Sequence, residues 1–173
     1  MDPGHTGLGY DQESTNSKSE MMKTILLMRA RTLEVDGAMG IGVESPVWEH
    51  VEDCVRRAYA FGGAVTLTAG YPETDTRIRH GVSINMSAHP QQCRLTYLPI
   101  EKLGEKTKLM EWWEPLDKPF RGTTVFHDHP FDDRTVCRDV DAAVRIFKDF
   151  FNNHDLTDSS LVDFLSVWDA KER

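Results

Sequence analysis

Cysteine is scarce in this chain, and its few positions exclude two common kinds of small-protein scaffold. The 173 residues contain three cysteines, at positions Cys54, Cys93 and Cys137. Their odd number and wide spacing do not form a disulfide framework, and no Cys-x-x-Cys pair indicates a structural zinc site. We therefore expect reduced thiols, as in a cytoplasm. Stability then has to come from a hydrophobic core, for which a chain of this length is sufficient.

The sequence also lacks the features of membrane proteins and of nucleic-acid-binding proteins. Its longest apolar run, ILLM at positions 25–28, is far shorter than the roughly 20 residues that span a bilayer. Acidic residues outnumber basic ones by 28 to 20, which gives a formal net charge of -8, and no dense cluster of Lys and Arg offsets it. Because nucleic-acid binding requires a basic surface, we expect neither a nucleic-acid partner nor a membrane. Acidity instead suits a basic protein partner, or serves only solubility.

Motifs for nucleophilic catalysis and for nucleotide binding are missing as well. The sequence has no Gly-x-Ser-x-Gly elbow, no P-loop, and no Gly-x-Gly-x-x-Gly that opens a helix after a strand. The short Gly-Ile-Gly at positions 40–42 does not complete any of these motifs. We therefore predict a protein that is not an enzyme and that needs no cofactor.

The distribution of polar and apolar residues divides the chain into a leader and one domain. Residues 1–21 are polar and rich in Gly and Ser, so we expect a disordered leader. They lack the basic start and apolar centre of a secretory signal, and Met21 or Met22 is an alternative translation start. Residues 22–173 contain no internal repeat and are interpreted as a single domain.

Hydrophobic periodicity in that domain predicts an α+β fold. The expected order is a strand, a helix, about five strands and two helices. Consecutive strands joined by short polar turns predict an antiparallel meander sheet of about five to six strands. One helix in the N-terminal half and two C-terminal helices would pack on it. The expected strands cover residues 23–30, 64–71, 78–87, 93–100, 106–114 and 120–127.

The first helix is expected directly after residue 44. Ser45 is a good N-cap, and Pro46 suits the first helical position. Gly62 and Gly63 would end the helix. Its apolar face would consist of Val47, Val51, Cys54, Val55 and Ala58.

Two further helices are expected near the C-terminus. Asp139 can cap the first of them, and Asn152 with Asn153 would end it. The second would begin near Asp158 or Ser159 and continue through residues 161–170. The apolar stripes are Val140, Ala143, Val144, Phe147, Phe150 and Phe151 in the first helix, and Leu161, Phe164, Leu165 and Trp168 in the second.

The segment FHDHPFDDR, residues 126–134, is the strongest candidate for a metal site in the sequence. His127 and His129 lie close to three aspartates, and histidine and carboxylate are common ligands of zinc, iron and manganese. A His-x-His-x-Asp-His hydrolase array does not match, and the spacing of the other histidines selects no third ligand. We favour a loop with the solvated acids Asp128, Asp132 and Asp133. A metal-binding protein or a metal-dependent hydrolase that uses His127 and His129 is the alternative.

The segment EWWEP, residues 111–115, is a second notable cluster. Trp112 and Trp113 are adjacent, and adjacent side chains on a strand face opposite sides. One tryptophan would then enter the core. The other would lie near the surface, where a tryptophan between Glu111 and Glu114 suits a protein interface, or it would be buried under a helix.

The last third of the chain has a distinctive order of elements. A strand GTTVFH leads through a polar loop to TVCRDVDAAVRIFKDFF and then to NNHDLTDSSLVDFL. This order resembles the end of small acidic immunity proteins that accompany bacterial polymorphic toxins. The residues that carry the likeness are Asp139, Phe147, Phe150, Phe151, Leu161 and Leu165.

The resemblance implies a cytoplasmic protein that binds a cognate toxin delivered by contact-dependent or type VI secretion. It implies inhibition by stoichiometric occlusion of the toxin. Many such toxins act on nucleic acids or nucleotides through a basic cleft, which an acidic inhibitor would complement. We therefore predict toxin binding as the function. The candidate partner-contacting residues are Glu111, Trp113, Glu114, Asp128, Asp132 and Asp133.

Overall fold

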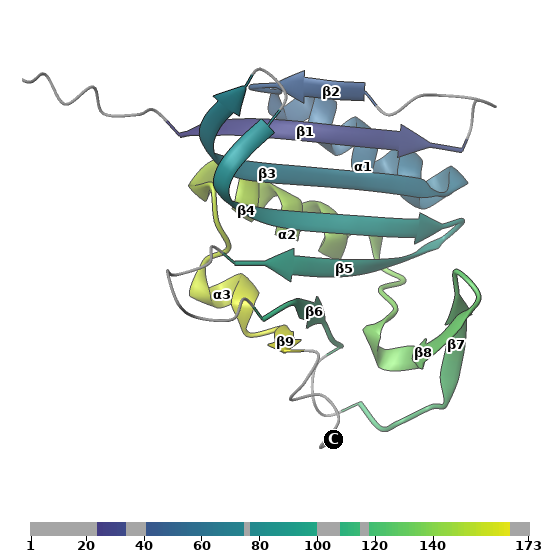
Figure 1. Cartoon of the computed structure of the whole chain (residues 1–173). Coiled ribbons are helices and arrows are strands. Elements are labelled where there is room, and N and C mark those ends of the chain that lie inside the picture. The colour runs from purple at the N-terminus through teal and green to yellow at the C-terminus, as the bar shows by residue number, and fades with distance from the viewer. Residues whose placement is uncertain (1–23, 34–40, 75–76, 100–107, 115–117, 167–173) are drawn as a thin grey trace, which may run out of the picture.

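The computed structural model describes residues 24–33, 41–74, 77–99, 108–114 and 118–166 of the chain, which form an α+β fold (Figure 1). Within these residues, seven strands form one antiparallel sheet in the order β2-β1-β3-β4-β5-β6-β9. The predicted leader and Trp168 lie outside the described residues. The strands of this sheet are β1 (Ile25–Thr32), β2 (Ile41–Glu44), β3 (Gly63–Thr74), β4 (Arg77–His89), β5 (Gln92–Leu98), β6 (Met110–Trp112) and β9 (Phe164–Ser166).

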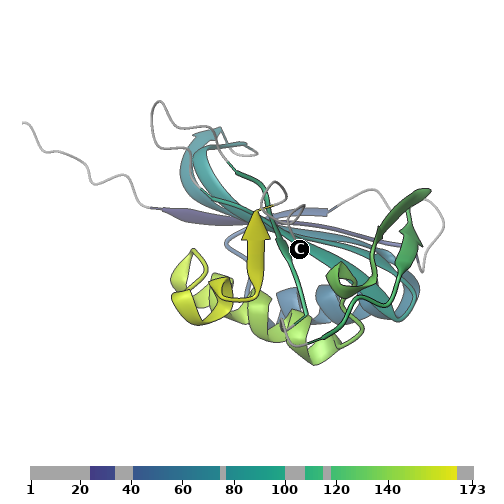
Figure 2. The same cartoon turned by 90° about the horizontal axis from the view of Figure 1, so that it is seen from below.

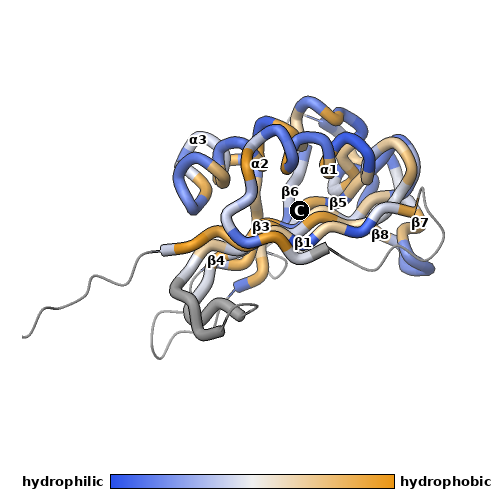
Figure 3. The backbone as a smooth tube through the Cα atoms, turned by 90° about the horizontal axis from the view of Figure 1, so that it is seen from above, coloured by the Kyte–Doolittle hydropathy of each residue, from blue (hydrophilic) through white to orange (hydrophobic). Residues whose placement is uncertain are grey.

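The helices cover one face of this sheet. They are α1 (Trp48–Phe61), α2 (Val140–Asn153) and the single turn α3 (Asp158–Leu161). Figure 2 shows α1 and α2 on the same side of the sheet. In Figure 3 their hydrophobic residues face the sheet and their hydrophilic residues face outward, which is the pattern of a helix that packs on a core. The predicted α+β class, with one helix in the N-terminal half and two near the C-terminus, is confirmed.

The central strands alternate between the two faces of the sheet. Val65, Leu67, Ile84, Met86 and Leu95 are at most 1% exposed and contribute to the core beneath the helices. The residues between them have short polar or charged side chains and are half-buried on the opposite face, because successive side chains of a strand point to opposite sides. We call this second face the open face, and its members include Thr66, Thr68, Ser83, Asn85, Ser87, Arg94 and Thr96.

The start of α1 differs from the prediction. The N-cap is Val47, which makes no side-chain capping bond, and Ser45 lies in the left-handed region with φ 50°. The Ser45 amide donates to the Leu26 carbonyl at 2.7 Å. Ser45 therefore belongs to the connection that leaves the sheet, and its predicted role as the N-cap is wrong.

The end of α1 is as predicted. The Gly62 amide donates to the Ala58 carbonyl at 2.8 Å, and Gly62 has φ 89°, a conformation that favours glycine. At Gly63 a Cβ atom would lie 2.1 Å from the Arg31 carbonyl oxygen, so only glycine fits where β3 begins beside β1.

The C-terminal segment confirms one expected helix and corrects the other. Asp139 caps α2, because its carboxylate accepts from the amides of Asp141 and Ala142 at 2.9 and 3.2 Å. The helix ends at Asn153, and His154 follows in the left-handed conformation. The expected third helix is wrong at residues 164–166, which form β9, and its positions 167–170 lie outside the described residues. This strand pairs with β6, which places Phe164 opposite Trp112.

Candidate functional site

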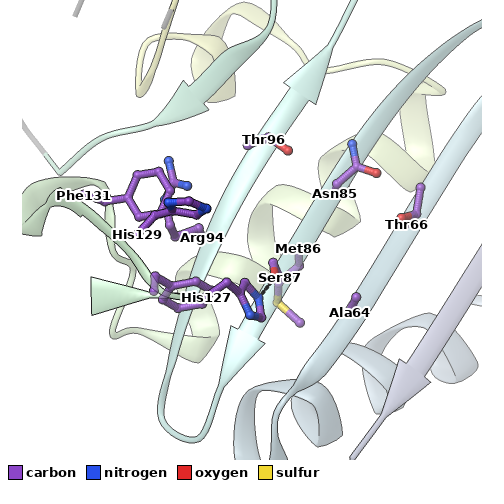
Figure 4. Close-up of a pocket in the computed structure, with 11 residues that line it drawn as sticks. Ala64, Thr66, Asn85, Met86, Ser87, Arg94, Thr96, His127, His129 and Phe131 are labelled. Atoms are coloured by element: carbon purple, nitrogen blue, oxygen red, sulfur yellow. Dashed lines mark hydrogen bonds between the residues drawn. The ribbon is translucent and has the colours of Figure 1, made fainter. Parts of the chain in front are cut away.

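A pocket of about 240 Å³ lies on the open face (Figure 4). Its floor is formed by short side chains of β3, β4 and β5, among them Thr66, Asn85 and Thr96. One side is formed by Phe126, His127, His129 and Phe131. The pocket therefore combines segments that lie far apart in the sequence.

The register of the strands explains why short side chains line the floor of the pocket. Thr66 pairs with Asn85, Asn85 with Thr96, and Thr96 with Glu111, so one row of polar side chains crosses four strands. Cross-strand partners share a face, and most of these side chains are short. The pocket forms where a neighbouring segment rises beside this row.

That neighbouring segment is a two-stranded ribbon. It consists of β7 (Thr123–Phe126) and β8 (His129–Asp132), joined by a turn of His127 and Asp128. Both turn residues have positive φ, 48° and 65°, as a two-residue type I′ connection requires. The expectation of a loop between the last strand and α2 is therefore wrong. In Figure 2 the ribbon stands at the side of the sheet and rises past it, away from the helices.

Pairing within the ribbon separates its two faces. Phe126 is paired with His129, and Thr124 with Phe131, so these four residues share the face nearer the pocket. Val125 and Pro130 occupy the other face, and the Val125 side chain is 66% exposed.

Three contacts hold the ribbon against the sheet. His127 Nε2 and Ser87 Oγ form a hydrogen bond of 2.6 Å. Phe126 is 1% exposed, and its ring packs edge-on against His89 with 4.5 Å between the ring centroids. The Arg94 guanidinium lies 3.5 Å from the centre of the Phe131 ring, a cation-π contact. These contacts give the pocket a preformed wall.

Arg94 also forms a buried ion pair with Glu111. The two side chains are 15% and 11% exposed. Loss of hydration raises the pKa of Glu111 and lowers the pKa of Arg94, and the opposite charge of each partner counteracts this effect. Glu111 was expected at a partner-contacting surface, but its carboxylate serves an internal pair.

The ribbon aspartates have different environments. Asp128 is exposed at the turn. Asp132 accepts from the Arg134 side chain at 2.7 Å and from the Arg134 amide at 2.9 Å, and these bonds lower its pKa. The expectation of three solvated aspartates is therefore wrong for Asp132, and it is also wrong for Asp133.

Asp133 is the centre of a small network of hydrogen bonds. It accepts from Thr124, from Arg138 at 2.7 Å and from Arg121 at 3.1 Å. Together these donors lower the pKa of Asp133 to about 2. The carboxylate therefore holds the end of β8 to both neighbouring arginines.

Both tryptophans of the EWWEP segment are buried. Trp112 is 7% exposed and Trp113 is 5% exposed. Strand β6 ends at Trp112, so Trp113 is free of the strand alternation that would have turned it outward. Trp113 instead donates its amide to the Asp163 carbonyl at 2.8 Å, and the Arg134 guanidinium lies 5.3 Å from the centre of its ring. Trp113 is therefore buried, and the expectation that one tryptophan lies near the surface is wrong, but the contacts that bury it come from Asp163 and Arg134.

The structure therefore distributes the six predicted contact residues over three environments. Glu111 and Trp113 are buried, and Asp128 is exposed. Glu114, Asp132 and Asp133 are half-buried and form ion pairs with arginines. Their role in contacting a partner stays a prediction, and Asp128 is the member best placed for it.

Sequence reasoning did not single out the pocket residues Ser87 and Arg94. They face each other across β4 and β5, and Ser87 bonds to a histidine 40 positions along the chain. No local motif could identify them, because their proximity depends on strand register.

The structure also shows how His127 and His129, the residues of the metal alternative, are arranged. Among the residues that the structure describes, no three His, Cys, Asp or Glu side chains lie close enough to hold a metal ion. His127 is bonded to Ser87, while His129 lines the pocket. Metal binding stays a prediction that elemental analysis of the purified protein tests.

Comparisons with known proteins bear on the fold alone. No family model and no curated protein matches the sequence. The fold is similar to the crystal structure of a hypothetical protein from Neisseria gonorrhoeae, with a TM-score of 0.53 and 8% identity. The similarity covers 80% of this chain and 94% of that chain. In the described part of this chain, no helix has the length and apolarity needed to cross a membrane.

Proposed function

We propose that this protein is an immunity protein that binds a cognate antibacterial toxin in the cytoplasm and neutralises it by stoichiometric occlusion. The observation that carries the proposal is the pocket on the open face, with the ribbon as its wall. A concave surface whose wall is already held in place by contacts with the sheet suits a protein partner, because little order has to be created on binding.

The size of the pocket favours a protein over a cofactor. Pockets for small molecules usually have volumes of about 300–1,000 Å³, whereas this pocket has a volume of about 240 Å³. It is better matched to one anchoring side chain of a partner. Such buried anchors contribute a large part of the free energy of many protein interfaces.

An exposed apolar residue extends the proposed interface. Leu98 shares the open face with Thr96 and is 38% exposed. A mixture of polar and apolar surface is typical of interfaces that form and dissociate, because these interfaces are about as apolar as the rest of a protein surface.

The negative net charge of the protein supports the proposal that its partner is basic. The net charge of -8 would attract a toxin with a basic cleft, and the exposed Asp128 places one acidic group at the tip of the ribbon. The acidic composition and the resemblance of the C-terminal third to immunity proteins both support a basic toxin as the partner.

The test uses the full chain and the product of the adjacent upstream gene. We expect that product to be toxic, and we expect a one-to-one complex by calorimetry that abolishes the toxicity. A product without toxicity and without affinity for the chain would reject the proposed function.

A pair of tryptophan substitutions tests the surface. Thr96→Trp would fill the pocket floor, and Asn152→Trp places the same side chain on the exposed surface of α2. We expect Thr96→Trp to weaken binding at least about tenfold, because an anchor loses its pocket. Asn152→Trp should bind normally. Equal affinities of two folded variants would remove the open face from the interface.

A further inference from the structure

Cys93 and Cys137 lie opposite each other in an isolated antiparallel bridge. Cys93 is at the start of β5, and Cys137 follows η1 (Asp133–Thr135), the short 3-10 turn that leaves the ribbon. The Cys93 amide donates to the Cys137 carbonyl at 2.9 Å, and the Cys137 amide donates to the Cys93 carbonyl at 2.8 Å. Both residues are 0% exposed. The bridge therefore joins the base of the ribbon to the main sheet.

The backbone of this bridge sets the spacing of the two cysteines. Residues that exchange both backbone hydrogen bonds have Cα atoms about 5.5 Å apart, which is inside the range of about 4.4–6.8 Å for disulfides. The Cys137 thiol lies 3.2 Å from the Asp139 carbonyl oxygen, to which it donates.

We propose that Cys93 and Cys137 are a covalent modification site, at which a reversible intramolecular disulfide fastens the base of the ribbon to β5. The third cysteine, Cys54, lies on α1 in another part of the fold. The proposal concerns this pair alone and is independent of the proposed function.

The oxidant is a low-molecular-weight disulfide such as oxidised glutathione. The Cys137 thiolate attacks one glutathione sulfur, and a new S–S bond forms as the first glutathione thiolate leaves. The Cys93 sulfur, after losing its proton, attacks Cys137 in this mixed disulfide and releases the second glutathione. Two protein thiols lose two electrons and two protons, and one oxidised glutathione becomes two reduced molecules.

The order of attack follows from the different environments of the two thiols. Interaction with Cys93 lowers the pKa of Cys137, whereas interaction with Cys137 and burial raise the pKa of Cys93. Cys137 is therefore the first of the two to ionise. Thiolates, not thiols, attack disulfides.

Geometry also makes this disulfide easier to reduce than a typical structural one. Cβ atoms of directly opposed residues lie about 4.5–5.5 Å apart, with the hydrogen-bonded pairs at the wide end, and a disulfide prefers about 3.8 Å. The backbone has to close this gap, and the resulting strain favours reduction. Because both thiols are buried, exchange requires that the isolated bridge opens.

The experiment uses the full chain with Cys54→Ser, so that Cys93 and Cys137 are the remaining thiols. The protein is unfolded, reduced and refolded in mixtures of reduced and oxidised glutathione, which removes burial as an obstacle. In the oxidising mixture we expect loss of both free thiols, a mass lower by two hydrogens, and a peptide that joins residues 93 and 137. The circular dichroism spectrum should match that of the reduced folded protein.

The controls are Cys54→Ser combined with Cys93→Ser or with Cys137→Ser. Each should keep one thiol or take up one glutathione, with no internal cross-link. The proposal is overturned if natively folded Cys54→Ser protein retains two free thiols or carries only glutathione adducts after oxidising refolding. It is also overturned if the cross-linked protein lacks the native spectrum, or if excess reduced glutathione does not restore both thiols without denaturant.

Discussion

At the scale of single residues, the ion pair of Arg94 with Glu111 stabilises the fold and also shapes the pocket. Their side chains are 15% and 11% exposed, so each charge is stabilised mainly by the opposite charge of its partner and little by hydration. Arg94 also covers the ring of Phe131. One ion pair thus connects β5, β6 and the ribbon.

Removing one partner of this pair should be costly. We expect Glu111→Leu to lower the free energy of unfolding by about 3 kcal/mol, because the Arg94 charge remains buried and unpaired. The combined variant Arg94→Met with Glu111→Leu should recover much of this loss, since no buried charge remains. Urea denaturation of the two variants and the natural chain measures the difference. A double variant as unstable as the single one would show that the charges themselves are needed.

Asp133 should make stability depend on pH in the acidic range. Its pKa is about 2 in the folded protein, below the value of about 3.9 in an unfolded chain. A lowered pKa adds stability above the unfolded value, and this contribution is lost as pH falls through the folded value. The loss should therefore occur between about pH 4 and pH 2.

The matched variant for this effect is Asp133→Asn. Its deficit in unfolding free energy relative to the natural chain should be largest near neutral pH and should shrink towards pH 2. Urea denaturation at a series of pH values gives both curves. A deficit that stays constant with pH would mean that the hydrogen-bond geometry of Asp133, and not its charge, stabilises the network.

At the scale of elements, β9 shows how a tertiary contact overrides a local pattern. Leucine and phenylalanine at helical spacing predict a helix through residues 161–170. The chain instead makes one turn, α3, and adds β9 to the edge of β6. Burial of Phe164, which is 3% exposed and lies edge-on to Tyr97, stabilises the strand.

We expect Phe164→Ala to lower the free energy of unfolding by about 3–5 kcal/mol, the range for a buried aromatic side chain. Val162→Ala, two positions earlier and 73% exposed, serves as the control. It should change stability by less than about 0.5 kcal/mol. Thermal or urea denaturation measures both. Similar small effects of the two substitutions would mean that β9 contributes little to the fold.

At the scale of the whole molecule, the sheet divides the chain into a helical side and the open face. The helices use one side for the core, and the ribbon shapes the other (Figure 2). The net charge of -8 acts at this scale, because the field of the whole surface guides an oppositely charged partner before contact.

We expect salt to slow the association of the toxin more than it speeds dissociation, since ions screen the attraction before contact. Asp128→Asn, at the exposed turn, removes the charge and tolerates the positive φ of this position, so it should lower the association rate constant at low salt and leave the unfolding free energy nearly unchanged. Surface plasmon resonance over a series of salt concentrations measures both rates. An association rate independent of salt would exclude charge steering.

Local patterns predicted the elements that depend on near neighbours in sequence. The Asp139 cap, the glycine end of α1 and the alternation of β3, β4 and β5 follow from backbone and side-chain geometry within a few residues. The ribbon turn escaped prediction because His-Asp is not a usual type I′ pair. Serine is a common N-cap residue, but the Ser45 amide donates to the Leu26 carbonyl in the sheet.

The sequence by itself determined the α+β class, the apolar faces and the acidic charge, because period and composition are local or additive properties. Only the tertiary structure decided that Glu111 is not available to a partner, since strand pairing brings Arg94 of β5 to it, whereas Arg134 and Arg138 neutralise Asp132 and Asp133 within five positions along the chain. It also decided the pocket and the Cys93–Cys137 bridge. Both depend on the register of strands whose residues are distant along the chain, and no local sequence pattern encodes that register.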